Sequence, residues 1–141
     1  MNVNDIMSKD VEIASAEDTL FDAAQKMRHA DAGVLPITAQ DGTVIGMLTD
    51  RDIVLRAVAG GGDPKTMRVG DVMTADPVTC RPDCPLDDAV NTMRDRQIRR
   101  LLVTQEHNKN VIGIISLGDI AARAHERELV GAATEDVCQP A

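Results

Sequence analysis

The stretch GMLTDRDI at residues 46–53 decides the fold of this chain, because it recurs as GIISLGDI at residues 113–120. Both copies contain a glycine, two apolar residues, a threonine or serine, two free positions and an aspartate. Outward from these stretches, residues 3–38 align with residues 69–104 at a constant shift, and the alignment resumes after one inserted residue. Sixteen of the 51 aligned positions are identical, so the chain consists of two copies of one supersecondary unit.

Each copy predicts the same order of elements, β-α-β-β-α, and therefore an α+β fold. A polar-capped turn opens each copy, and an extended piece, a helix of period 3.6, a hairpin and a second helix follow. We expect Asp18 to cap the first helix and Pro85 to lie in the first turn of its counterpart. In the two copies the opening turns are 5–7 and 71–73, the extended pieces 11–14 and 78–80, the hairpin strands 34–38 with 43–48 and 100–104 with 111–115, and the closing helices 50–59 and 117–130.

One such unit leaves an apolar sheet face uncovered, so the two units should pack together into one module. We predict a first repeat at residues 1–59, a linker at 60–68 that begins with three consecutive glycines, and a second repeat at 69–125. Residues 126–141 would form a C-terminal helix or tail.

The composition excludes several classes of protein. The chain has 141 residues and a formal net charge of −8, and Phe21 is its single aromatic residue. Such a chain lacks the positive charge and the stacking platforms of nucleic-acid-binding proteins, so we expect no nucleic-acid partner. The first residues do not resemble a signal peptide, and no apolar run reaches the length of a membrane helix. These features favour a cytoplasmic protein without a membrane partner.

The three cysteines, Cys80, Cys84 and Cys138, are interpreted as reduced, small apolar side chains. Their number is odd and no second Cys or His pair stands at zinc spacing, so we expect no metal site. Pairing of Cys80 with Cys84, or metal binding by the two, is the alternative.

The sequence shows no catalytic constellation. Asp50 and Asp52 are near neighbours, but residues two positions apart do not share a helix face. No GxxxxGK[ST] phosphate loop occurs, and the three glycines from Gly60 are typical of a linker. We therefore expect a protein that is not an enzyme, although a turnover assay is needed to exclude catalysis.

The repeated Thr/Ser-x-x-Asp motif has two readings. A hydroxyl residue followed three positions later by an acid is close to a capping box, which only stabilises a helix start. The same geometry suits a nucleotide, because helix N-terminal amides attract phosphate and a carboxylate can accept hydrogen bonds from ribose hydroxyls. Arg51, inside the first motif, would add a charge-assisted bond to phosphate.

These residues resemble the cystathionine-beta-synthase (CBS) domain family, in which two domains form a Bateman module. The likeness covers about residues 3–123 and rests on DIM and DVM, on GVLPI at 33–37 and RRLLV at 99–103, and on the two octapeptides. The resemblance implies two repeats packed pseudo-symmetrically and a regulatory role that senses an adenosine ligand (AMP, ADP, ATP or S-adenosylmethionine) and signals to a protein partner. It requires no cofactor, and a structural or protein-interaction dimer with an empty cleft is the alternative function.

The resemblance also implies the ligand-binding residues. The motif residues would hold ribose and phosphate, while the first extended piece and the following strand of each copy would line a base pocket. The first site would contain Thr49, Arg51, Asp52, Ile13, Ala14, Ser15, Val34, Leu35 and Pro36, and the second Ser116, Asp119, Thr79, Cys80, Arg100, Leu101 and Leu102.

The two copies are not equal. The second copy has Gly118 where the first has Arg51, and Leu102 where the first has Pro36, so the sequence favours the site at Thr49 and Asp52. Apolar residues also follow each hairpin, at Ile53, Val54, Ala57 and Val58 in the first copy and at Ile120, Ala121 and Ala124 in the second. Because one module cannot cover both a sheet face and these helices, we expect a homodimer. A monomer with its C-terminal helix over this surface is the alternative.

Overall fold

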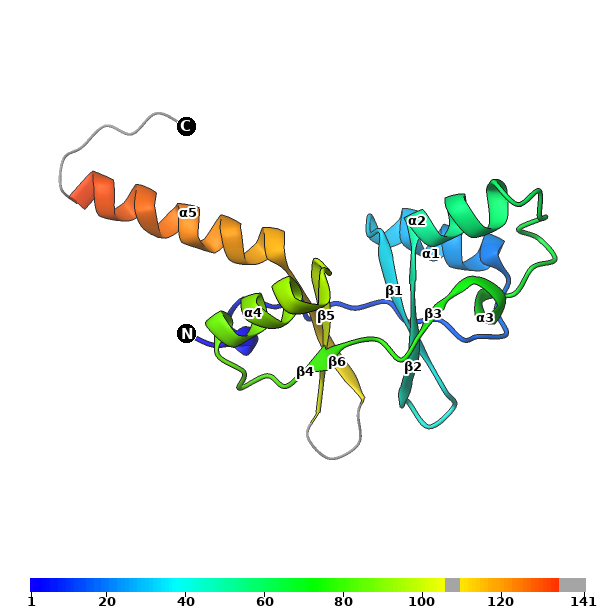
Figure 1. The fold of residues 1–141 in the computed structure, drawn as a ribbon, viewed down its shortest axis with the longest axis horizontal. Helices are drawn as coiled ribbons and strands as arrows, with labels where there is room; N and C mark the ends of the chain where they lie inside the picture. Colours follow the sequence, from blue (N-terminus) through cyan, green and yellow to red (C-terminus); the bar gives the residue numbers. More distant parts are fainter. Residues whose placement is uncertain (106–109, 135–141) are drawn as a thin grey trace.

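The protein folds into two lobes joined side by side, as the computed structural model shows (Figure 1). The structure describes residues 1–105 and 110–134. Each lobe contains a three-stranded sheet with helices packed beside it, and helix α5 extends away from the second lobe (Figure 1). The predicted α+β fold with two repeats is confirmed.

The elements follow one another in the predicted order, except that strand β3 is added and the first extended piece of the first copy does not form a strand. The first copy contains η1 (Val3–Asp5), α1 (Leu20–Ala30), β1 (Val34–Thr38), β2 (Val44–Thr49), α2 (Asp50–Asp52) and the π-helical turn η2 (Ile53–Val58). The second contains α3 (Val69–Val72), β3 (Thr74–Ala75), β4 (Thr79–Cys80), α4 (Leu86–Arg96), β5 (Arg100–Thr104), β6 (Val111–Ser116) and α5 (Leu117–Thr134).

The cap of α1 differs from the prediction. Thr19, not Asp18, caps the helix, because its hydroxyl accepts a hydrogen bond from the amide of Asp22 at 3.1 Å. Asp18 turns back instead and accepts from the amide of Ser15 at 3.0 Å. Pro85 stands just before α4 rather than within its first turn. The first extended piece is reduced to a single parallel bridge between Ala14 and Ile37.

The two copies exchange their opening turns. Strand β3, which follows the opening turn of the second copy, pairs antiparallel with β2 of the first copy, with Met47 opposite Thr74. In the opposite direction, Ser8 forms an antiparallel bridge with Ile114 of β6, with hydrogen bonds of 2.9 and 3.0 Å. Each sheet is therefore completed by a segment that belongs, in sequence, to the other copy.

The hydrophobic cores show the same exchange. Val69 and Val72 of α3 are buried in the first core together with Leu35, Ile37 and Leu48. Val3 and Met7 are buried in the second core, whose other members are Ala89, Met93, Leu101, Val103 and Ile115. Each repeat consequently lacks part of its own core and takes it from the other.

Glycines at equivalent positions permit this exchange. A Cβ atom on Gly113 would lie 2.6 Å from the sulfur of Met7 and 2.9 Å from the carbonyl oxygen of Ser8. On Gly46 it would lie 2.7 Å from the sulfur of Met73 and 3.0 Å from the carbonyl oxygen of Thr74. The glycine that opens each repeated octapeptide therefore makes room for the incoming segment.

Candidate functional site

The repeated motif forms a reciprocal capping box in both copies. In the second, the amide of Ser116 donates to Asp119 Oδ2 at 3.0 Å, and the amide of Asp119 donates to Ser116 Oγ at 3.0 Å. In the first, Thr49 and Asp52 make the same two bonds at 3.0 and 3.1 Å. Both motifs therefore form the capping box, and a ligand must use hydrogen-bonding groups that take no part in it.

The helix-start amides are largely engaged. In α5 the first amide, Leu117 N, donates to the carbonyl of Arg99 at 2.8 Å, and the third, Asp119 N, is bonded to Ser116. In α2 the first amide, Asp50 N, donates to the carbonyl of Gly33 at 3.0 Å. Fewer amides therefore remain for phosphate than the motif alone suggests.

A cleft of about 310 Å³ opens beside the second motif. It draws on both copies: the segment after η1, the end of α1 with the start of β1, the start of β5, and the junction of β6 with α5. Its lining residues are Ser8, Asp10, Val11, Glu12, Ala30, Asp31, Ala32, Gly33, Val34, Arg100, Ile114, Ser116 and Asp119. Four of the predicted site residues, Val34, Arg100, Ser116 and Asp119, meet here, although Val34 was expected at the first site.

The two motif aspartates differ in their second carboxylate oxygen. Asp52 Oδ1 lies 3.8 Å from the guanidinium of Arg56, which also donates to the carbonyl of Val72 at 2.8 Å. In the second copy, Arg123 occupies the position equivalent to Arg56 and pairs with Glu126 at 3.7 Å. Among the residues that the structure describes, Asp119 Oδ1 has no hydrogen-bond or ion-pair partner. Asp119 also lines the cleft, and the acceptor capacity of this oxygen is unused.

The remaining predicted residues lie elsewhere. Leu35, Leu101, Leu102 and Pro36 are fully buried in the sheets, so they have no surface to offer a ligand in this conformation. Arg51 is exposed on α2, and its amide donates to Asp50 Oδ1 at 2.8 Å. Ile13, Ala14 and Ser15 line a separate hollow of about 250 Å³ together with Asp18, Lys26, Thr38, Ala39 and Gln40.

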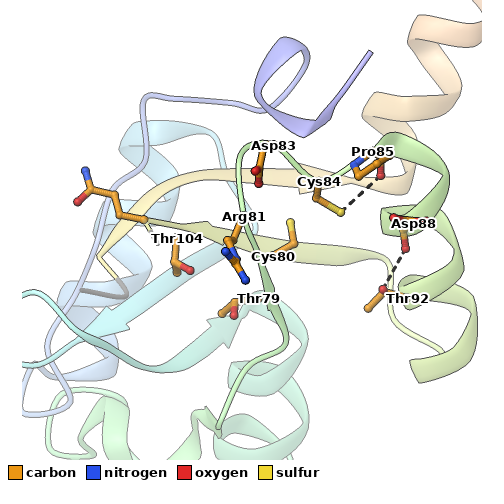
Figure 2. A pocket seen from close by; sticks show the side chains of 10 residues that line it. Thr79, Cys80, Arg81, Asp83, Cys84, Pro85, Asp88, Thr92 and Thr104 are labelled. Atoms are coloured by element: carbon orange, nitrogen blue, oxygen red, sulfur yellow. Dashed lines mark hydrogen bonds between the residues drawn. The ribbon is translucent and has the colours of Figure 1, made fainter. Parts of the chain in front are cut away.

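Thr79 and Cys80 line the equivalent hollow of the second copy, of about 690 Å³ (Figure 2). Neither lines the cleft at Ser116. In Figure 2 the side chains of Cys80 and Cys84 lie near each other, and Cys84 Sγ is 3.4 Å from the carbonyl of Pro85. Burial, with a smaller contribution from Cys84, raises the pKa of the Cys80 thiol to about 12. Burial also raises the pKa of Cys84, and the charges of Asp88 and Asp83 act in the same direction.

We predict that Cys80 alkylates slowly in the folded protein. A pKa raised to about 12 leaves far less thiolate near pH 8 than an ordinary thiol has, and the thiolate is the reacting species. In a variant with Cys84→Ser and Cys138→Ser, iodoacetamide should modify Cys80 about a hundredfold more slowly in buffer than in urea. Mass spectrometry over time measures both rates. Equal rates in the folded and unfolded protein would show that the thiol is not held neutral.

Sequence reasoning missed nine of the thirteen residues that line the cleft. The segment from Ser8 to Glu12 and the residues from Ala30 to Gly33 line it, yet neither was a candidate. The short polar segment has no periodicity, and its position follows from the exchange of opening turns. The repeated DIM and DVM turns were the available signal, because the lining segment begins directly after the first of them.

The comparisons with known proteins agree on one family. The family model for the CBS domain matches residues 3–58 and again residues 69–126. Hypoxic response protein 1 of Mycobacterium tuberculosis is 36% identical over 136 residues, which are 96% of this chain and 93% of that protein. The CBS domain-containing protein YhcV of Bacillus subtilis is 38% identical over 136 residues, 96% of this chain and 94% of that one.

Solved structures show the same fold. The crystal structure of Hypoxic Response Protein I with two coordinated zinc ions is 37% identical, has a TM-score of 0.75, and is matched over 86% of this chain and 98% of that chain. The CBS domain pair of protein MJ0100, in complex with 5′-methylthioadenosine and S-adenosyl-L-methionine, is 25% identical with a TM-score of 0.81, over 90% and 98% of the two chains. Within residues 1–105 and 110–134, no group of three or more His, Cys, Asp or Glu side chains is placed to hold a metal ion. The same residues contain no helix long and apolar enough to cross a membrane.

Proposed function

This chain belongs to the CBS-domain family, and from that membership we propose that it is a regulatory module that binds an adenosine ligand in the cleft at Ser116 and Asp119 and signals to a protein partner. The observation that carries the proposal is the unused acceptor at Oδ1 of Asp119, a residue that lines a cleft built by both repeats. A carboxylate that is held by its cap and keeps one oxygen free suits the hydroxyls of a ribose.

Two further observations support this role. The domain pair of MJ0100 is described in complex with two adenosine compounds, which shows that a related pair accepts such ligands. The CBS family model matches both repeats, and stand-alone CBS pairs are typically regulatory.

We propose the second copy as the principal site. The sequence favours the first copy because Arg51 stands there, but Arg56 lies against Asp52 and competes with ribose for its carboxylate. The Asp52 side chain is also only 13% exposed, which limits the access of a ligand to its carboxylate. Ligand binding at Thr49 and Asp52 would be weaker for these reasons.

A thermal-shift panel tests the proposal. Adenosine, 5′-methylthioadenosine, S-adenosylmethionine, AMP, ADP and ATP are compared with guanosine and GMP on the full chain. A ligand at about a hundred times its Kd stabilises the folded state by about 2.7 kcal/mol, a readily measured rise in Tm. No shift with any adenosine compound would leave a structural or protein-interaction dimer as the function.

We also propose that the module forms a homodimer through η2. The apolar residues predicted for this helix differ in exposure. Ala57 is fully buried, whereas Val54 is 54% exposed and Val58 61%. Leu55, next to Val54 in sequence, is 51% exposed. Helix α5 extends away from the lobe that contains η2 (Figure 1). If η2 of a second copy packed against η2 of the first, the exposed apolar side chains of both copies would be buried.

Light scattering during size exclusion checks the dimer. The full chain should elute with twice its monomer mass of 15.1 kDa, and Val54→Glu with Val58→Glu should restore the monomer. The matched control is Phe21→Glu, which changes an apolar residue of similar exposure, 42%, on α1. A monomeric wild type at micromolar concentration would refute the dimer.

A further inference from the structure

The cleft at Ser116 and Asp119 is acidic. Asp10, Glu12 and Asp31 join Asp119 in its lining, and Arg100 is the one basic lining residue among them. Within the described part of the chain, Asp10, Glu12 and Asp31 make no ion pair. The whole chain also carries a net charge of −8, so the long-range field has the same sign as the cleft.

The backbone around the cleft adds to this potential. Helix α1 ends at Ala30, which lines the cleft, so the partially negative C-terminal end of the helix lies beside it. At the other wall, the helix start of α5 would favour an anion, but two of its first three amides are already bonded to Arg99 and Ser116. The fold therefore offers little phosphate-binding capacity to offset the carboxylates.

Basic residues near the cleft do not reverse its sign. Lys26, Arg28 and His29 line a neighbouring hollow that shares only Glu12 with the cleft. Lys26 is held there by the carbonyl of Ile13 at 2.8 Å and lies 3.8 Å from Asp18. Even with Glu12 set aside, Asp10, Asp31 and Asp119 face a single arginine.

The repeat shows that the fold does not require this acidity. The shift that superimposes the copies carries Glu12 onto Val78 and Asp31 onto Gln97. It also carries Ala30 onto Arg96 and Gly33 onto Arg99, so the counterpart surface gains two cations. The charge of each site is thus set by the side chains at that site and not by the shared fold.

From these charges we infer that the cleft selects adenosine ligands whose 5′ substituent is uncharged or cationic, and that it rejects nucleoside polyphosphates. This inference rests on the proposed function, because it assigns the ligand class of the same site. A thioether or a sulfonium at the 5′ position meets the carboxylates without repulsion, whereas each added phosphate brings at least one further negative charge. A monophosphate, which Arg100 can pair with, should rank between the two classes.

Calorimetry on the Asp52→Ala variant tests the inference, because only one motif then remains intact. Adenosine, 5′-methylthioadenosine, S-adenosylmethionine, AMP and ATP are titrated with and without magnesium, and again after Asp119→Ala is added. The binding that Asp119→Ala abolishes is assigned to the cleft. At low salt, 5′-methylthioadenosine and S-adenosylmethionine should bind at least about tenfold more tightly than ATP, and the gap should narrow at about 0.5 M salt as screening increases.

A charge-neutralising variant isolates the cause. Asp10→Asn with Asp31→Asn should tighten ATP about tenfold and change 5′-methylthioadenosine less than about twofold. Asparagine suits the left-handed backbone of residue 31, where φ is 52°, so the fold should tolerate this change. The control, Glu17→Gln with Asp87→Asn, removes the same charge from exposed sites outside the cleft and should leave both affinities within about twofold.

The outcomes separate the inference from the proposed function. If ATP binds the cleft as tightly as 5′-methylthioadenosine, or if the control variant tightens ATP equally, the charge selection is wrong and the adenosine site stands. If no adenosine compound shows Asp119-dependent binding, the proposed function itself fails.

Discussion

Val3→Ala should destabilise the second repeat, although Val3 is in the first repeat by sequence. Val3 is fully buried among Met93, Leu101 and Ile115 in the second core, and its amide donates to the carbonyl of Cys84 at 2.9 Å. Loss of two buried methyl groups should cost about 1–2 kcal/mol, and Met7→Ala in the same core about 2–5 kcal/mol. The double variant should therefore lose a large part of the 5–15 kcal/mol that stabilises a typical domain.

Hydrogen exchange locates the damage. In Val3→Ala the amides of β5 and β6 should lose protection first, and those of β1 should keep more of it. Val69→Ala is the matched variant, because Val69 is equally buried but in the first core, and it should reverse the pattern. Ile13→Ala, at a residue that is 44% exposed, should change the unfolding free energy by less than about 1 kcal/mol. If each variant lost protection only in the repeat to which the residue belongs by sequence, the exchange of opening turns would be contradicted.

Asp119→Ala should weaken adenosine binding about 10- to 150-fold, which corresponds to the 1.5–3 kcal/mol of a hydrogen bond to a charged group. Asp52→Ala should weaken it much less, because Arg56 already occupies that carboxylate at 3.8 Å. This order is opposite to the one that Arg51 suggests from sequence. Calorimetry on the wild type and both variants measures it, and equal losses would refute the asymmetry between the copies.

Asp119 also caps α5, so its variants must separate binding from stability. Removal of the carboxylate frees the amide of Ser116 and should cost about 1 kcal/mol of folding. Asp119→Asn keeps an acceptor for that amide and should recover most of this stability, but its NH₂ group replaces the second acceptor that ribose needs. A variant with lower Tm and unchanged ligand affinity would show that the motif is only a cap.

The order of the elements could be predicted from the sequence because the same apolar periodicity occurs twice and is bounded by glycines and capping residues. The pairing across the copies could not, because a repeat shift gives the same match whether η1 packs on its own copy or on the other. Thr79 and Cys80 illustrate the consequence. They pair with β5 as expected, yet they line the hollow of about 690 Å³ and not the cleft at Ser116.

The cap of α1 shows a second limit. Asp18 and Thr19 are adjacent, and both residue types are good caps, so composition alone could not choose between them. Asp18 is drawn into the turn at Ser15, which leaves Thr19 at the helix start. The acidity of the cleft was likewise hidden, because Asp10, Asp31 and Asp119 are far apart in sequence and meet only after both copies are in place.

The exchange of opening turns also sets when the chain can finish folding. Val3 and Met7 are synthesised before every other buried member of their core, which is complete only when Ile115 has emerged from the ribosome. Contacts over such long sequence separations close slowly, because their loop entropy is paid before any packing is gained. The buried residues of the first core end at Val72, so this core can close before β6 is synthesised. During synthesis the first core can therefore be complete while the turn that contains Val3 and Met7 stays unpacked until β6 has emerged.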